Sequence, residues 1–163
     1  MDELELDLGF MGMYRHSLDE KGRVIIPAEF RNKMGERCVL TRGMEGCLFL
    51  FSIKDWASFL DKLRNSDFTQ RQKRDFERAI FPYSTFRQLD GQGRILIPSL
   101  LRERAQLNGE VLLIGVNDRI ELWDPQIWDI FNEEAMPSLE KAAEDIFQSD
   151  AKDLKYSFFN SVS

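Results

Sequence analysis

Histidine and cysteine, the side chains that most often bind metals or carry out nucleophilic chemistry, are scarce in this sequence of 163 residues. The single histidine, His16, excludes metal sites built from several histidines and makes imidazole catalysis unpromising. The two cysteines, Cys38 and Cys47, have the spacing of neither zinc nor redox motifs and lie in apolar stretches. We therefore expect two buried free thiols, no metal and no cofactor.

Long apolar runs are lacking too, because none approaches the roughly 20 residues that a membrane-spanning helix needs. The first five residues, MDELE, are acidic, whereas a signal peptide begins with basic residues. The segment Gly91-Gln92-Gly93 is too short for a dinucleotide-binding loop. We expect a cytoplasmic protein with neither a membrane partner nor a small-molecule substrate.

The charge is unevenly distributed along the chain, whose net charge is −6. Residues 1–8 hold four of the 28 acidic residues and no basic one, and residues 132–163 hold seven acidic and three of the 22 basic residues. Residues 9–131 therefore carry 17 acidic and 19 basic side chains. A mildly basic centre permits binding to nucleic acid, which needs a local basic face rather than a basic whole.

An internal repeat dominates the sequence. Residues 18–31 read LDEKGRVIIPAEFR, and residues 89–102 read LDGQGRILIPSLLR. At an offset of 71 the identical positions are Leu18, Asp19, Gly22, Arg23, Ile26, Pro27 and Arg31 with Leu89, Asp90, Gly93, Arg94, Ile97, Pro98 and Arg102. At an offset of 72 they are Val39, Leu40, Gly43, Leu50 and Trp56 with Val111, Leu112, Gly115, Leu122 and Trp128. Twelve identities indicate a duplication.

Each copy predicts the same local structure. Residues 19–22 and 90–93 place Asp first and Gly fourth, which predicts a type I turn closed by a left-handed Gly, a hairpin with a bulge. First strands are expected at 14–18 and 85–89. The apolar runs 24–26 and 95–97 are typical of strands buried on both faces.

Proline then marks a helix in each copy, since Pro27 and Pro98 suit the first turn of a helix but not a strand ladder. Further helices are expected at 28–34, 99–105, 53–63, 68–80 and 135–147, and another is expected to start at 125. Two strand pairs are expected, 38–41 with 47–52 and 111–115 with 119–123. We expect repeat 1 at 13–55, a helical connector at 56–83, repeat 2 at 84–127, and a helical, acidic extension at 128–163.

The two Asp-x-x-Gly-Arg-x-x-x-Pro-x-x-x-Arg motifs resemble the SpoVT-AbrB superfamily. Two copies in one chain, together with the segments 11–16 (MGMYRH) and 121–124 (ELWD), resemble the MraZ family over about residues 11–131. This resemblance implies an α+β fold, a pseudo-symmetric swapped-hairpin (AbrB-like) β-barrel with connecting and C-terminal helices. One chain supplies both halves, in keeping with a single hairpin module being too small to bury a core.

The resemblance also implies a function. It implies a sequence-specific transcription regulator that is associated with the nucleoid and binds double-stranded promoter DNA. The binding sites are direct repeats upstream of the protein's own cell-division and cell-wall operon. The protein is expected to bind them as a ring-like homo-oligomer. The alternative is an antitoxin or other protein-binding module of the same superfamily. Two copies spaced by helices argue against it, because antitoxins normally carry one motif and a disordered tail. We do not expect an enzyme, since turn geometry accounts for Asp19 and Asp90 without catalysis.

Arg23 and Arg94 are the main candidates for DNA contacts. Each follows a turn glycine, and the planar guanidinium donates paired hydrogen bonds to phosphates or guanine edges. The alternative role is an internal salt bridge with Asp19 or Asp90, and both roles are compatible.

Two weaker candidates for DNA contacts are Lys21 and Arg15, for which ordinary solvated charge is the alternative. Arg87 corresponds to His16 in the repeat, and this pair is expected to flank the binding face. Arg31 and Arg102 fit a structural role, as ion-pair or helix-face residues. The aromatic set Trp56, Phe59, Trp123 and Trp128 fits a core or a subunit interface. The basic run 71–74 fits a solvated helix face, with an auxiliary phosphate contact as its alternative.

Overall fold

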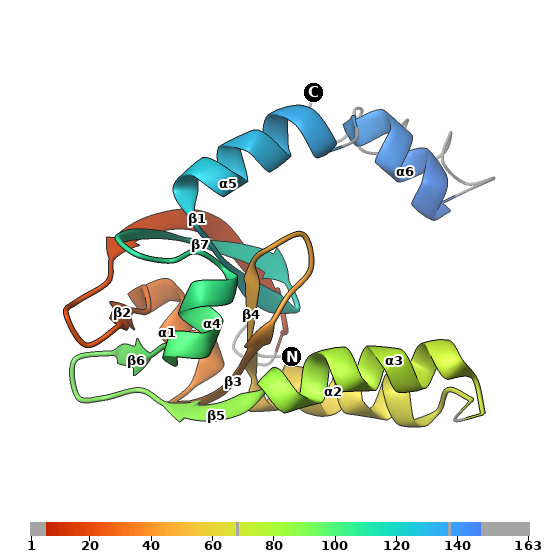
Figure 1. Ribbon diagram of the computed structural model, residues 1–163, viewed down its shortest axis with the longest axis horizontal. Coiled ribbons are helices and arrows are strands. Elements are labelled where there is room, and N and C mark those ends of the chain that lie inside the picture. The colour runs from red at the N-terminus through yellow and green to blue at the C-terminus, as the bar shows by residue number, and fades with distance from the viewer. Residues whose placement is uncertain (1–5, 68, 137, 148–163) are drawn as a thin grey trace. The chain divides into compact units, whose positions relative to one another are not determined.

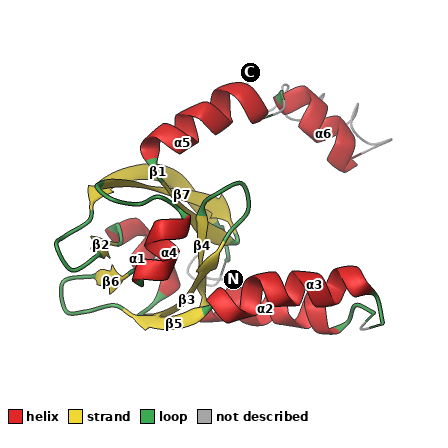
Figure 2. Ribbon diagram, in the orientation of Figure 1, coloured by secondary structure: helices red, strands yellow, loops and turns green. Residues whose placement is uncertain are grey.

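The computed structural model of the chain describes residues 6–67, 69–136 and 138–147. The chain divides into two compact units, Met1–Trp128 and Asp129–Ser163. Both expected repeats lie in the first unit, and the structure has the α+β class expected from the sequence (Figure 2). None of the described helices is long and apolar enough to cross a lipid bilayer.

The strands follow the two repeats. They are β1 Phe10–Ser17, β2 Arg23–Ile25, β3 Arg37–Arg42, β4 Leu48–Ser52, β5 Thr85–Gln88, β6 Arg94–Leu96, β7 Glu110–Asn117 and β8 Arg119–Trp123 (Figure 1). The helices are α1 Ala28–Met34, α2 Ile53–Arg64, α3 Arg71–Ile80, α4 Ser99–Arg104, α5 Pro125–Ile130 and α6 Leu139–Phe147. Short turns of 3₁₀ and π type follow α3 at Phe81–Tyr83 and α5 at Phe131–Ala135.

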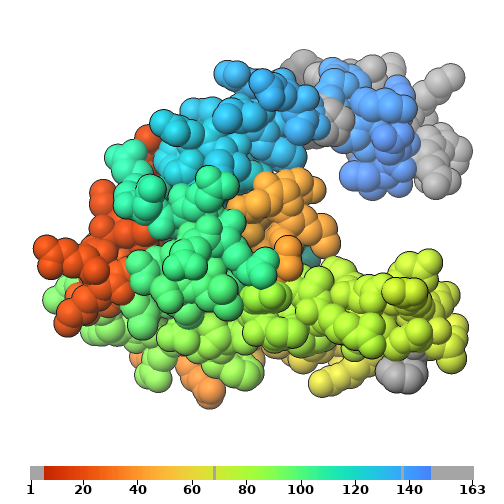
Figure 3. Space-filling model, viewed as in Figure 1, coloured from red at the N-terminus to blue at the C-terminus, as the bar shows by residue number. Residues whose placement is uncertain are grey.

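The first strand of each repeat pairs with the other repeat. In the six-stranded antiparallel sheet, of order β1-β7-β8-β4-β3-β5, β1 runs along β7 from Phe10 opposite Asn117 to Ser17 opposite Glu110. In the same way β5 pairs with β3. In Figure 3 the red surface of the N-terminal part of the chain lies against the green surface of the second repeat. Neither repeat therefore completes a sheet by itself.

The strands after the turns leave this sheet. Within the described segments, β2 and β6 pair only with each other, as a two-stranded ribbon. The turns predicted at 19–22 and 90–93 do form, but β2 pairs with β6 and not with β1. Among the described residues no pairing joins the edge strands β1 and β5. The closed barrel implied by the resemblance is therefore not found in the described part of the chain, where the strands that follow the turns pair across the repeats in a separate ribbon.

One hydrophobic core joins the two repeats. Phe30, Leu50, Ile95 and Leu122 are among its fully or almost fully buried members. Its buried residues are Phe10, Val24, Ile26, Phe30, Met34, Cys38, Leu40, Leu48, Leu50, Ile95, Ile97, Leu101, Ala105, Leu107, Val111, Leu113, Ile120 and Leu122. Since both repeats contribute throughout, neither copy retains a complete core alone.

The prediction that 24–26 and 95–97 are buried on both faces is wrong. Val24 and Ile95 are buried, but Ile25 and Leu96 are each 41% exposed. Successive side chains of a strand point to opposite faces, and the core covers only the inner face of the ribbon.

The connector is a helical hairpin that packs through aromatic rings. Trp56 and Ile80 are buried in a second cluster with Val39 and Phe51, and the rings of Trp56 and Phe59 are 5.2 Å apart. The expected helix at 68–80 begins instead at Arg71, because Asp67 accepts the backbone N–H of Thr69 and closes a turn before it.

The C-terminal helix begins at Leu139 rather than at 135. Met136 is extended (φ −72°, ψ 125°), the conformation favoured before a proline, and residue 137 is Pro. The part of the extension beyond residue 147 lies outside the described residues.

Both cysteines are free and buried, which confirms the prediction of free thiols. Burial raises the pKa of the Cys38 thiol to about 12 and also raises the pKa of the Cys47 thiol. Both thiols are therefore protonated at neutral pH.

Candidate nucleic-acid interface

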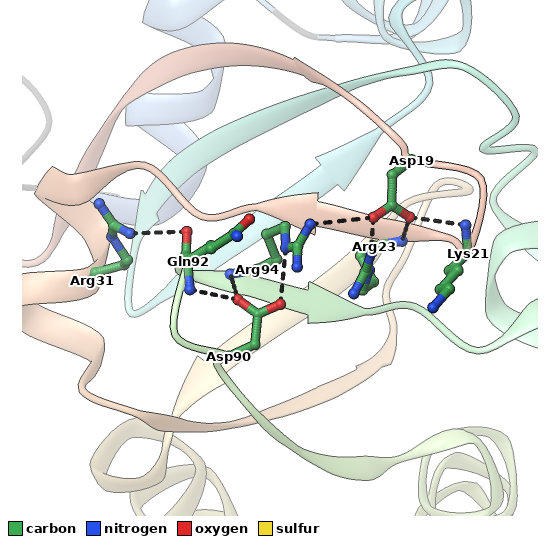
Figure 4. A network of polar contacts seen from close by, with 7 residues as sticks. All are labelled: Asp19, Lys21, Arg23, Arg31, Asp90, Gln92 and Arg94. Atoms are coloured by element: carbon green, nitrogen blue, oxygen red, sulfur yellow. Dashed lines mark hydrogen bonds and ion pairs between the residues drawn. The ribbon is translucent and has the colours of Figure 1, made fainter.

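The two sequence motifs meet on the β2–β6 ribbon. Arg23 lies opposite Leu96, Val24 opposite Ile95, and Ile25 opposite Arg94. Because Val24 and Ile95 point into the core, the alternating Arg23 and Arg94 point outward. Figure 4 shows these two arginines side by side on adjacent strands, with their aspartates at the turns.

Asp19 organises the first turn. Its Oδ1 accepts hydrogen bonds from the backbone N–H groups of Lys21 and Arg23, each at 2.9 Å. Its Oδ2 accepts a hydrogen bond from Nε of Arg23 at 2.6 Å. The backbone N–H of Gly22 donates to the Asp19 carbonyl at 3.0 Å. These contacts, foremost the backbone hydrogen bond from Arg23, lower the pKa of Asp19, so the carboxylate is charged at neutral pH.

Asp90 repeats the arrangement in the second turn. Its Oδ1 accepts the backbone N–H groups of Gln92 and Arg94, and its Oδ2 accepts Nε of Arg94 at 2.8 Å. The pKa of Asp90 is lowered chiefly by the backbone hydrogen bond from Arg94. In addition, Nη1 of Arg94 lies 3.8 Å from Oδ2 of Asp19, which links the two turns (Figure 4).

Each guanidinium is thus held through Nε. For Arg23, Asp19 is the only hydrogen-bond or ion-pair partner of the side chain among the described residues, so both terminal nitrogens are available to a ligand. Two parallel donors of this kind match a guanine edge or a phosphate. The internal salt bridges considered as the alternative are present, and they orient the arginines without occupying both terminal nitrogens.

The last arginine of each motif packs on the turn of the other repeat. Arg102 donates from Nε to the Ile97 carbonyl at 2.9 Å, and its guanidinium covers Gly22. Arg31 lies over Gly93 and donates from Nη1 to the Gln92 carbonyl at 3.5 Å. Of the two structural roles expected for these arginines, the ion pair is not found among the described residues, and each guanidinium instead donates to a backbone carbonyl of the second repeat.

The backbone conformation explains why glycine stands fourth in each turn. Gly22 has a φ of 83° and Gly93 a φ of 75°, a left-handed conformation that glycine adopts without strain. A Cβ atom at Gly22 would also lie 2.6 Å from Cζ of Arg102. The carbonyl groups of the same glycines accept hydrogen bonds from the other repeat. The backbone N–H of Ile26 donates to the Gly93 carbonyl, and the backbone N–H of Ile97 donates to the Gly22 carbonyl.

Pro27 and Pro98 stand directly before α1 and α4. Their carbonyls accept the N–H groups of Arg31 and Arg102, each at 3.0 Å. The prolines thereby start the helices that carry the two arginines to the turns.

The remaining candidates lie outside the aspartate–arginine network, except Lys21. Lys21 is exposed, and its backbone N–H contacts Asp19. Arg15 on β1 forms an ion pair with Glu110 at 2.8 Å. Arg87 on β5 donates to Oγ1 of Thr85, and its buried Nε has no hydrogen-bond partner among the described residues.

Comparisons with known proteins agree with the duplicated architecture. A family model described as "MraZ protein, putative antitoxin-like" matches residues 10–79 and again residues 80–150. A protein of Desulforamulus reducens named "Transcriptional regulator MraZ" is 42% identical over 137 residues, covering 84% of this chain and 96% of the relative. A protein of the same name from Moorella thermoacetica is 43% identical over 141 residues, covering 86% and 99%. The chain therefore belongs to the MraZ family.

Proposed function

We propose that this protein is a sequence-specific DNA-binding transcription regulator whose β2–β6 ribbon enters the major groove. The observation that carries the proposal is the pair of outward guanidinium groups, one from each repeat, held through Nε by Asp19 and Asp90. The major groove is wide enough for a two-stranded ribbon, and arginine is the commonest reader of guanine there. The relatives named as transcriptional regulators support the same function.

Residue roles follow from position. Arg23 and Arg94 contact guanine edges or phosphates, and Lys21 contacts a phosphate beside the first turn. Arg15 and Arg87, on the strands that lead into the turns, are auxiliary contacts to the DNA backbone. No catalytic step, cofactor or small-molecule substrate is needed, and the site of action is the nucleoid in the cytoplasm.

We further infer that residues 13–55 and 84–127 are pseudo-symmetric halves of a swapped-hairpin, AbrB-like unit. The connector at 56–83 and the extension from 128 lie outside the two halves. The pairing of β1 with β7 and of β5 with β3 supports this interpretation, as do the two crossed arginine–glycine contacts.

The DNA proposal is tested by gel shift with the DNA just upstream of the gene that encodes this chain. We expect a discrete complex that survives competition by scrambled DNA of the same composition. Affinity should fall steeply with salt, because each neutralised phosphate contributes a slope of about −0.9 in log K against log salt. Equal affinity for upstream and scrambled DNA would contradict sequence-specific binding.

We also propose that the regulator acts as a ring-like homo-oligomer on direct repeats, because head-to-tail neighbours present their ribbons in one orientation. A groove of about 460 Å³ beside the connector is lined by aromatic side chains that include Phe49, Phe59 and Phe76, and it is a candidate contact between copies. Light scattering at micromolar concentration should give a mass several times the 19.1 kDa of the chain. A monomer would contradict the proposal.

A protein-binding role is the second candidate, because the description of the matching family includes the word antitoxin. It predicts that a tight partner of different sequence co-purifies with the chain. Isolation of a homogeneous protein that binds the upstream DNA by itself would argue against it.

A further inference from the structure

We propose that Ile25 and Leu96 are specificity-determining residues that contact the methyl groups of thymines in the DNA. This inference rests on the proposed function, and it adds a second kind of reading to that of the arginines. It predicts which bases stand beside those that Arg23 and Arg94 contact.

The geometry of the ribbon places an aliphatic side chain directly across from each arginine. In the antiparallel pairing of β2 with β6, Arg23 lies opposite Leu96 and Ile25 lies opposite Arg94. Since alternate residues share a face, all four side chains lie on the outer face, in two antiparallel arginine–aliphatic pairs. The exposed fraction is 41% for both Ile25 and Leu96, so the two repeats present them equally.

Among the described residues, neither of these two side chains belongs to the hydrophobic core. Val24 and Ile26 of the first repeat, and Ile95 and Ile97 of the second, bury the inner face almost completely. An exposed Ile and an exposed Leu beside two guanidinium groups leave branched apolar atoms in water. A partner that offers both hydrogen-bond acceptors and apolar groups at this spacing satisfies both kinds of side chain.

The major groove offers that combination. Guanine presents two acceptors, O6 and N7, and the C5 methyl of thymine is the apolar group on the base edges. Opposite residues of a strand pair are about 5 Å apart, a distance that spans neighbouring base pairs, which stack at 3.4 Å. The arrangement therefore fits a thymine next to each guanine read by an arginine, on both halves of the ribbon.

The experiment removes the methyl groups from the DNA. The upstream DNA is amplified with dUTP in place of dTTP, so that every thymine in the amplified stretch becomes uracil. Binding of the full chain to the thymine and uracil forms is compared for the wild type, for the Ile25→Ala, Leu96→Ala double variant and for Ile53→Ala. Ile53, on α2, is also 41% exposed, which makes it a matched control.

We expect the wild type to bind uracil DNA about 15-fold more weakly, because burying one methyl group is worth roughly fourfold in affinity and two contacts are lost. The double variant should bind thymine DNA about 15-fold more weakly and lose almost nothing further on uracil DNA. Ile53→Ala should behave as the wild type. Thermal melting and light scattering check that the double variant keeps its fold and its mass.

Three results would overturn the inference. They are a wild type indifferent to uracil, a double variant as sensitive to uracil as the wild type, and a double variant whose mass falls, which would assign Ile25 and Leu96 to a contact between copies. Failure of the proposed function is a different result, in which the wild type binds neither form of the upstream DNA specifically.

Discussion

The Arg23→Ala, Arg94→Ala double variant is expected to bind the upstream DNA at least ~30-fold more weakly than the wild type, because each bidentate base contact is worth about 1–3 kcal/mol. The loss should grow further in an oligomer, since every copy on the DNA lacks the same contacts. The measurement is a set of binding isotherms for upstream and scrambled DNA at several salt concentrations.

Lysine variants at the same positions separate base reading from phosphate binding. Lysine keeps the charge but has neither the planar fork nor the Nε that Asp19 and Asp90 hold. If the arginines read guanine, Arg23→Lys and Arg94→Lys should lose specificity nearly as fully as the alanine variants. If they contact only phosphate, the lysine variants should bind almost normally, and each alanine should reduce the salt slope by about 0.9.

The matched control for the arginines is Arg64→Ala, which removes an exposed positive charge at the end of α2, outside the ribbon. It should leave specific binding unchanged. The melting temperature of the arginine variants should change little, because both aspartates keep their backbone hydrogen bonds when the guanidinium is removed. Unchanged binding by the double alanine variant would contradict the assignment of the ribbon as the reading surface.

Gly115→Ala is expected to be the most destabilising small substitution in the sheet. Gly115 lies in β7 opposite Gly12 of β1, and a Cβ atom there would come 2.7 Å from Cα of Met11 and 2.8 Å from the carbonyl carbon of Phe10. These are backbone atoms, so β1 has to move away from β7. We expect a loss of about 3 kcal/mol, at the upper end for overpacking, and a fall in melting temperature of about 6–12 °C.

Gly109→Ala is the control for this substitution. Gly109 directly precedes β7, and a Cβ atom there would meet nothing within 4 Å. It should change the melting temperature by only a degree or two. Equal stability of the two alanine variants in thermal melts would show that the close approach of β1 to β7 does not limit the fold.

Local structure was predictable from the sequence because local chemistry determines it. The Asp and Gly of residues 19–22 specify the turn, and Pro27 specifies where α1 starts. Strand partners were less predictable from residue patterns. Nothing in residues 10–17 says that their partner is β7, some 100 positions away, rather than β2.

The exposure of Ile25 was missed for a related reason. Three consecutive apolar residues, 24–26, look the same whether one or both faces of a strand are covered, and coverage depends on the rest of the chain. In the candidate site, Arg23 and Arg94 were identifiable from the repeat. The contacts of Arg31 and Arg102 were not, because each packs on the other copy's turn.

The pairing of β1 with β7 also determines when the six-stranded sheet can be completed during synthesis. Residues 10–17 are made early, but their partners at 110–117 follow about 100 residues later. At about 5–20 residues per second, the ribosome needs roughly 5–20 s to add them. During that time β1 of the nascent chain has no β7 to pair with. The first repeat therefore reaches its native form only when most of the second repeat has been translated.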